Sequence, residues 1–177
     1  MATAAATATA GTPASKTRAR RMQKLVTTKP AFGAMLWAKL PLAAFAGMRV
    51  ERLDGERCEV SLPAGWKTQN PFGSMYFAAQ AMAAEASTGM PALWFIEESG
   101  LSMASLVTGI SAQFTKKGTS KATFTFEGGA AMRAAIEKAA ATGEPVVHVA
   151  KSVGTQKNGE VIAVFEITWS FKRRGKR

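Results

Sequence analysis

The chain has 177 residues, of which 47% are apolar, and a formal net charge of +11 at pH 7. This length is sufficient for one domain with a proper core plus extensions. No stretch reaches the roughly 18 uninterrupted apolar residues that a membrane span needs. The single cysteine, Cys58, excludes an internal disulfide and a zinc site built from cysteines.

The positive charge is confined to the two ends of the sequence. Residues 1–29 contain six basic side chains and residues 172–177 contain five, with no acid in either segment, and these eleven equal the whole excess. Residues 30–171 contain 12 basic and 12 acidic side chains. Because no recognition motif accompanies the charge, we expect solvated basic ends and no specific nucleic-acid binding.

The first part of the chain differs in composition from the rest. Residues 1–21 are rich in Ala, Thr and Arg and contain no acid, which is typical of a disordered extension. Organelle transit peptides share this composition, so an organelle remains an alternative to the cytoplasmic location that we favour. Residues 22–46 are expected to form one or two short helices, interrupted near Pro30 and Pro41.

A folded domain is expected over residues 47–172, followed by a basic tail at 173–177. It begins with two short strands around Asp54-Gly55, a dipeptide that favours a type I′ hairpin turn. In the second of these strands Cys58, Val60 and Leu62 share one face.

The segment NPFGSMYFAAQAMAAEASTG, residues 70–89, predicts a helix that is apolar on nearly every side. Asn70 or Ser74 is the expected cap, and Gly89-Met90-Pro91 is the expected stop. Glu85 lies in the middle of this helix. An ionised carboxylate is costly in such surroundings unless something pairs with it or uses it.

The remaining sequence predicts four more strands and one short helix. Alternating patterns indicate strands near 106–114 and 121–127, a helix follows at 130–143, and a last hairpin turns at Asn158-Gly159. In the final strand, side chains from Val161 to Phe171 alternate toward one face. We therefore predict an α+β fold in which a curved antiparallel sheet wraps around the buried helix.

This architecture and the start of the helix resemble the hotdog-fold thioesterases. Acyl-CoA thioesterases similar to the phenylacetate-pathway enzyme carry N-x-x-G-x-x-H-G-G, with a carboxylate twelve residues after the first Gly. Asn70-Pro71-Phe72-Gly73 matches N-x-x-G, and Glu85 lies at the position of the carboxylate. The sequence departs from the pattern at Tyr76, which replaces His, and at Phe77-Ala78, which replaces Gly-Gly. From about residue 47 to 172 the chain also resembles a poorly characterised branch of this superfamily.

The resemblance implies hydrolysis of an acyl-CoA or acyl-carrier thioester, with neither cofactor nor metal. Glu85 would act as general base or nucleophile, and burial would raise its pKa toward a useful range. Backbone N–H groups near Tyr76 and Phe77 would stabilise the oxyanion. The resemblance further implies a homodimer or a dimer of dimers, with pockets between subunits. The remaining site residues are Asn70, which would position a loop or water, Tyr76 as a hydrogen-bond donor, and Gly73, Met75, Phe77 and Met82 at the substrate.

Other interpretations remain open. Glu85 could be structural and accept hydrogen bonds from a neighbouring loop or subunit. The departures at Tyr76 and Phe77 also fit an acyl- or lipid-binding protein that has lost the chemistry. A third possibility is a protein that acts on membranes or nucleic acid through its basic ends. The lone His148 and the lone Asp54 are far apart in the sequence, which argues against a hydratase.

Overall fold

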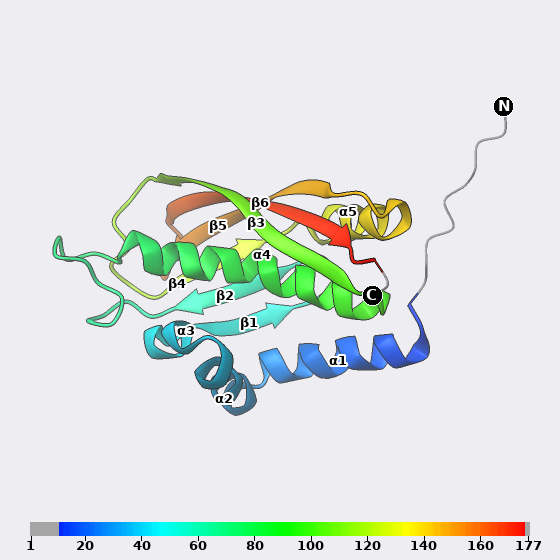
Figure 1. The fold of residues 1–177 in the computed structure, drawn as a ribbon. Coiled ribbons are helices and arrows are strands. Elements are labelled where there is room, and N and C mark those ends of the chain that lie inside the picture. The colour runs from blue at the N-terminus through cyan, green and yellow to red at the C-terminus, as the bar shows by residue number, and fades with distance from the viewer. Residues whose placement is uncertain (1–10, 176–177) are drawn as a thin grey trace.

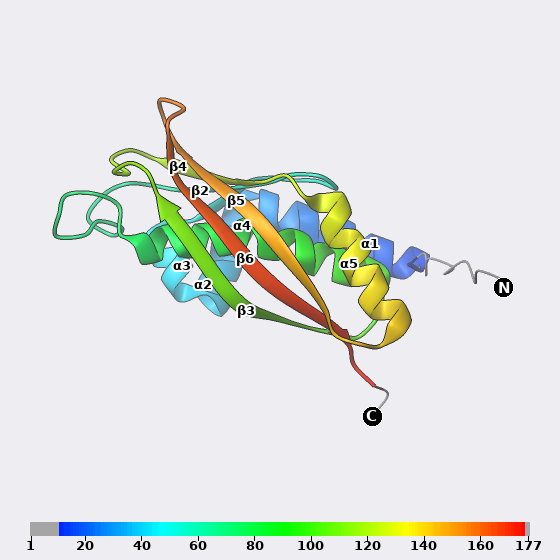
Figure 2. The same cartoon turned by 90° about the horizontal axis from the view of Figure 1, so that it is seen from above.

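The computed structural model describes residues 11–175, in which a curved six-stranded antiparallel sheet covers one long helix. The strands lie in the order β1-β2-β4-β5-β6-β3. Figures 1 and 2 show the strands crossing over helix α4, as the α+β prediction required. The elements are α1 (Pro13–Thr27), α2 (Lys29–Lys39), α3 (Pro41–Ala46), β1 (Arg49–Leu53), β2 (Cys58–Leu62), α4 (Phe77–Ser99), β3 (Met103–Phe114), β4 (Ala122–Phe126), α5 (Gly129–Thr142), β5 (Val146–Gln156) and β6 (Val161–Arg173).

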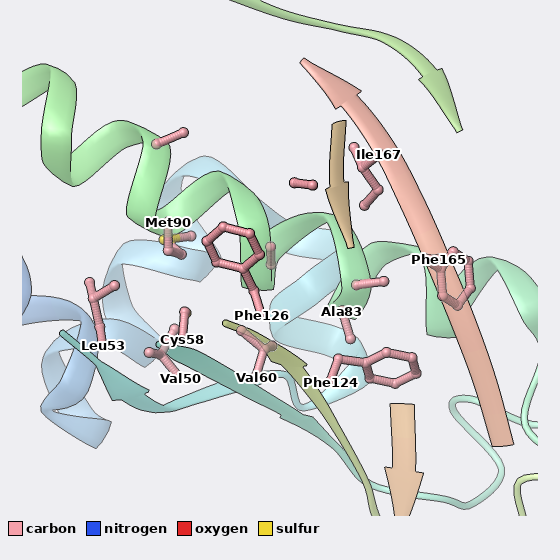
Figure 3. Close-up of a cluster of buried hydrophobic side chains, with 14 of the residues drawn as sticks. Val50, Leu53, Cys58, Val60, Ala83, Met90, Phe124, Phe126, Phe165 and Ile167 are labelled. Carbon is pink, nitrogen blue, oxygen red and sulfur yellow. The ribbon is translucent and has the colours of Figure 1, made fainter. Parts of the chain in front are cut away.

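The core lies between the sheet and α4. Its largest side chains are phenylalanines from β4 and β6, and Figure 3 shows several of them beside α4 residues such as Ala83. Replacing one such phenylalanine by alanine costs about 3–5 kcal/mol of stability. The predicted faces of β2 and β6 are confirmed as core, except that Val161 at the start of β6 is exposed. The fully buried aromatic and aliphatic side chains include Val60, Leu62, Phe124, Phe126, Phe165, Ile167 and Phe171.

Helix α4 begins later and ends later than the predicted 70–89. Residues before Phe77 form a separate turn, and the helix continues through Pro91 to Gly100, whose φ of +69° ends it. Pro91 lacks the N–H of a regular helical residue, but Pro91 and Ala92 are both buried, and their burial favours continuation. Glu97 and Glu98 lie in the last turn of this helix.

The prediction of disorder for residues 1–21 is wrong over residues 13–21, which form the first part of α1; residues 1–10 lie outside the described residues. Ser15 and Ala19 are almost fully buried, and the Ser15 hydroxyl donates a hydrogen bond to the Glu98 carbonyl at 2.7 Å. Small side chains at a spacing of four allow α1 to lie close to the end of α4.

The predicted helical interruptions near Pro30 and Pro41 are confirmed. Each proline lies in the first turn of its helix, α2 or α3. A backbone N–H at that position has no acceptor within the helix, so its absence in proline costs no helical hydrogen bond. In the part of the chain that the structure describes, no helix is long and apolar enough to cross a membrane.

Both predicted hairpins form, but the first turn is not type I′. The Asp54 side chain accepts hydrogen bonds from the N–H groups of Glu56 and Arg57 at 3.0 and 2.9 Å. A type I′ turn requires positive φ at both central residues. Within residues 11–175 only certain glycines have positive φ, and Gly55 is not one of them.

Strand β3 forms an edge of the sheet and pairs only with β6. Its large apolar side chains were expected to join a dry face, but Leu106 is 65% exposed and Ile110 is 53% exposed. An exposed apolar edge strand presents unpaired backbone groups to another chain.

Candidate functional site

The turn that precedes α4 is built by Asn70. Its Oδ1 accepts hydrogen bonds from the N–H groups of Phe72 and Ser74 at 3.0 and 3.2 Å. Gly73 closes the turn with a φ of +71°, a conformation that favours glycine. Asn70 is therefore a turn residue rather than the helix cap, and its amide nitrogen has no partner among residues 11–175.

The first turn of α4 offers backbone N–H groups, as predicted, but not the one of Tyr76. That N–H donates to the carbonyl of Thr68 at 2.7 Å. The first helical hydrogen bond is donated by Gln80 to the Tyr76 carbonyl, so the N–H of Phe77 lies among the free donors at the positive end of the helix. The expectation is thus corrected for Tyr76 and unchanged for Phe77.

The side chains of Tyr76 and Phe77 are both exposed, with ring centroids 4.8 Å apart. The Phe77 ring also meets Phe114 of β3, at 6.4 Å between centroids. The Tyr76 hydroxyl makes no hydrogen bond within residues 11–175. It is accessible to a ligand without being held in a fixed position.

A cavity of about 380 Å³ lies at this end of α4. It brings Asn70, Met75 and Phe77 together with Gln80 and with the segment from Phe114 to Gly118. Lys116 and Lys117 on that segment give its rim a positive charge. Gly73, Tyr76, Met82 and Glu85 do not line it.

Glu85 lies on α4 eight residues beyond Phe77, which corresponds to about 12 Å along the helix axis. A single thioester group cannot contact both the Glu85 carboxylate and the Phe77 N–H of one chain. The structure therefore does not bring the predicted catalytic groups together within one subunit.

The Glu85 carboxylate is partly buried and has no partner in residues 11–175, either by hydrogen bond or by ion pair. Burial raises its pKa above the ordinary glutamate value. Space beside it is provided by Gly89, since a methyl group at that position would lie 3.0 Å from Glu85 Oε1 and 3.3 Å from the ring of Trp169. The carboxylate is thus next to an apolar ring and a glycine, an arrangement that favours proton uptake.

Two hydrogen bonds to the sheet fix α4 around Glu85. The indole N–H of Trp169 donates to the Thr88 hydroxyl at 3.0 Å, and the hydroxyls of Ser87 and Ser152 lie 2.8 Å apart. None of these residues is among the predicted site residues, and Gly89 was expected to be part of the helix stop. The one available signal was that Gly89 follows Glu85 by four residues, on the same face of a helix.

Other titratable groups lie elsewhere. His148 lies on β5 at a separate cavity of about 580 Å³, beside Arg57 and Lys151, and burial lowers its pKa. Burial raises the pKa of the Cys58 thiol, which keeps it protonated. Within residues 11–175 no cluster of His, Cys, Asp or Glu could hold a metal ion.

Comparison with known proteins identifies a family and a fold. The model of a family described as "Domain of unknown function (DUF4442)" matches residues 28–171. No curated protein matches the chain in sequence. Neither the family match nor the solved structures single out the phenylacetate-pathway branch of the thioesterases.

Three solved proteins show the same fold, that of hotdog thioesterases. A Pseudomonas aeruginosa protein of unknown function, described as "Probable Thioesterase", has 20% identity and a TM-score of 0.65, over 88% of this chain and 95% of that one. A Haemophilus influenzae thioesterase has 15% identity and a TM-score of 0.59, over 82% and 91% of the two chains. A Staphylococcus aureus thioesterase has 16% identity and a TM-score of 0.59, over 75% and 98%. Two structures of the last protein carry substitutions, one of a glutamine and one of a glutamate fifteen residues further along.

Proposed function

Because this chain belongs to the DUF4442 family and has the fold of hotdog thioesterases, we propose that it hydrolyses acyl thioesters of coenzyme A or of an acyl-carrier protein. The observation that carries this proposal is the Glu85 carboxylate. It is partly buried, has a raised pKa and lacks a partner in the described chain, beside a glycine that leaves space. A purely structural carboxylate would be paired.

Hydrolysis by Glu85 follows one of two routes. As a general base, its carboxylate removes a proton from water while the water oxygen attacks the thioester carbonyl. As a nucleophile, it attacks the carbonyl itself and forms an anhydride that water then cleaves. In both routes the tetrahedral intermediate collapses by breaking the carbon–sulfur bond, and the thiolate leaves. Either route needs the ionised carboxylate, so turnover should rise as the pH rises through the pKa of Glu85.

The oxyanion would be stabilised by the backbone N–H of Phe77. This N–H is free of helical partners and lies at the positive end of α4. Because Glu85 lies about 12 Å away along the same helix, the N–H would come from a second subunit. We therefore propose a homodimer in which Glu85 of one subunit meets Phe77 of its partner, alone or as part of a dimer of dimers.

The exposed β3 edge supports this assembly. Two β3 strands related by a two-fold axis would pair antiparallel, cover Leu106 and Ile110, and place the two α4 helices in opposite directions. In that arrangement the start of one α4 lies beside the middle of the other.

We extend the proposal to the residues that would contact the substrate. Asn70 would use its free amide nitrogen to hold the attacking water or the thioester, and Tyr76 would offer its exposed hydroxyl. Asn70 precedes Glu85 by fifteen residues. The glutamine and the glutamate that are replaced in the two Staphylococcus aureus structures are also fifteen residues apart. Gly73 and Phe77 would shape the entrance of the substrate site. The methionines Met75 and Met82 would line the part of that site that holds the acyl chain.

The test is thiol release from a panel of acyl-CoAs with short, long and aromatic acyl groups. Wild type should turn over at least one member, and Glu85→Gln should lose this activity while remaining folded. Glu137→Gln on the exposed side of α5 makes the same chemical change far from the site and should behave as wild type. Full activity in Glu85→Gln would contradict the assignment of Glu85.

A second candidate function is acyl or lipid binding without hydrolysis. It is favoured by the bulky Phe77 side chain, which occupies the position of a glycine in the motif and packs on Phe114. Extraction of a bound acyl compound from the purified protein, with no turnover of any acyl-CoA, would support this candidate over hydrolysis.

A further inference from the structure

We propose that a surface formed by α2, α3 and the loop before α4 docks on an anionic lipid bilayer. We call this surface the α3 face; Figure 1 shows α2 below β1 and α3 at the left end of β1. The proposal does not depend on the thioesterase activity. The face consists of four large apolar side chains and three basic ones: Trp37, Leu42, Phe45, Trp66, Lys29, Arg49 and Lys67.

The apolar part of the α3 face is unusually exposed. Leu42 is 71% exposed, Trp66 is 72% exposed and Trp37 is 62% exposed. Leu42 and Phe45 are three residues apart on α3 and share one side of it, while Ala43 and Ala46 are buried. Such a patch marks an interaction site, and tryptophan is enriched where protein meets the membrane interface.

These side chains form two groups of neighbours. The ring of Phe45 packs edge-on against that of Trp66, with centroids 5.6 Å apart. A shallow cavity of about 190 Å³ joins Trp37 to Lys29 and to Arg49 at the start of β1. Aromatic and basic groups are therefore neighbours in two places, Trp37 with Lys29 and Arg49, and Phe45 and Trp66 with Lys67.

The charge of this region is complementary to anionic lipid. Lys67 Nζ lies 5.0 Å from the ring centre of Phe45 and 5.7 Å from that of Trp66. The first acid in the chain is Glu51, and its carboxylate is engaged by Lys121 at 2.7 Å. Residues 11–50 contain eight basic side chains and no acid, and two of them, Lys29 and Arg49, belong to the α3 face.

Basic and apolar groups on one face are the pattern of a helix that lies in a membrane interface. A second copy of the chain is a poorer occupant, since two such faces would bring like charges together. The uncharged apolar edge at β3 is better suited to self-association. Nucleic acid would use the lysines and arginines but would leave Leu42 without a partner.

The experiment is co-sedimentation of the full chain with phosphatidylcholine vesicles, with and without phosphatidylserine. Binding should require phosphatidylserine and weaken as salt is raised. Tryptophan fluorescence should be quenched by brominated lipid, and the double variant Trp37→Phe/Trp66→Phe should lose this quenching because the other two tryptophans, Trp94 and Trp169, are outside the face.

Leu42→Glu and Trp66→Glu should each reduce partition onto phosphatidylserine vesicles by about tenfold or more. Val147→Glu is the control, because it makes the same charge change at an exposed apolar residue on β5. Circular dichroism verifies the fold of each variant. Lys67→Glu provides a second test that leaves the apolar residues in place and should also weaken binding.

Three outcomes would overturn the proposal. In the first, wild type fails to prefer phosphatidylserine vesicles. In the second, Val147→Glu weakens binding as much as Leu42→Glu does, which would show diffuse attraction to the net charge. In the third, Leu42→Glu reduces the size of the oligomer and leaves vesicle binding unchanged, which would assign the face to contact between copies of the chain.

Discussion

Trp169 of β6 donates its indole N–H to the hydroxyl of Thr88 on α4 at 3.0 Å, and that hydroxyl donates in turn to the backbone carbonyl of Glu85 at 2.9 Å. The sheet and the helix are therefore linked directly beneath the carboxylate. This link holds the backbone of Glu85 in position, while the side chain remains free of partners in the described chain.

Gly89 should be required for activity more than for stability. In Gly89→Ala the new methyl would lie 3.0 Å from Glu85 Oε1, so the carboxylate must move. Alanine favours a helix by about 1 kcal/mol over glycine, which offsets part of the strain. We predict a measurable loss of turnover, because the carboxylate must shift by a few tenths of an ångström, with a small change in the free energy of unfolding.

The control for this change is Gly33→Ala in α2, where no atom lies within 4 Å of the new methyl. It should raise stability by about 1 kcal/mol and leave turnover unchanged. Steady-state kinetics and denaturant unfolding measure both effects. Unchanged turnover in Gly89→Ala would show that the position of the carboxylate is not critical.

Glu85 should make the protein less stable at high pH. Its folded-state pKa is raised above the ordinary value of 4.5, so the folded protein binds the proton more tightly than the unfolded chain does. The resulting stability is fully present below pH 4.5 and is lost as pH rises through the folded pKa. Each unit of raised pKa corresponds to about 1.4 kcal/mol.

Glu85→Gln should therefore be more stable than wild type above the folded pKa, and this difference should vanish below pH 4.5. Urea unfolding at several pH values tests the prediction. A Glu85→Gln protein that is less stable at high pH would mean that the carboxylate has a stabilising partner.

Phe77 should act through its backbone rather than its side chain. Phe77→Pro removes the N–H, together with the ring, at the first helical position. Proline is well tolerated there, and the extended backbone of Tyr76 (φ −65°, ψ 134°) suits a residue before proline. Turnover should fall by about a hundredfold to a thousandfold, the effect of losing one oxyanion donor.

Phe77→Ala is the matched control, because it removes the ring and keeps the N–H. Turnover should persist in this variant and fail in Phe77→Pro, with helix content equal by circular dichroism. Equal activities would exclude the Phe77 N–H as an oxyanion donor.

The β3 edge should hold the dimer together. Ile110→Glu places a charge on an exposed edge residue that the proposed dimer would bury, so sedimentation should show a folded monomer without turnover. Val149→Glu on β5 is equally exposed but lies away from that edge, and it should remain dimeric and active. A monomeric Ile110→Glu protein with full turnover would place the whole site within one subunit.

The sheet could be predicted from the sequence because its signals are local. Alternating side chains gave the faces of β2, β4 and β6, and Asn158-Gly159 gave the last hairpin. The limits of α4 could not be predicted in this way. Asn70 is typical of a cap but builds a separate turn, and Pro91 is typical of a stop but lies in a helix that burial maintains.

The failures at α1 and at the site have a common cause, which is packing between distant segments. Ser15 and Ala19 belong to a composition typical of disorder, yet they fit against the end of α4. Glu85 and Phe77 are close in sequence, and only the length of the helix shows that one subunit holds them too far apart. The Trp169–Thr88 hydrogen bond joins residues 81 positions apart and has no local signal.

The most direct test of the account is to measure thiol release after Glu85→Gln and Phe77→Pro proteins are mixed and allowed to exchange subunits. Each variant alone has either a defective carboxylate or a defective oxyanion donor at every site. A mixed dimer has one site in which both groups are intact, so random pairing should restore about one quarter of wild-type turnover. Such recovery is the result that the account predicts. No recovery, in a mixture shown to contain mixed dimers, would contradict a site shared between Glu85 and the partner subunit's Phe77.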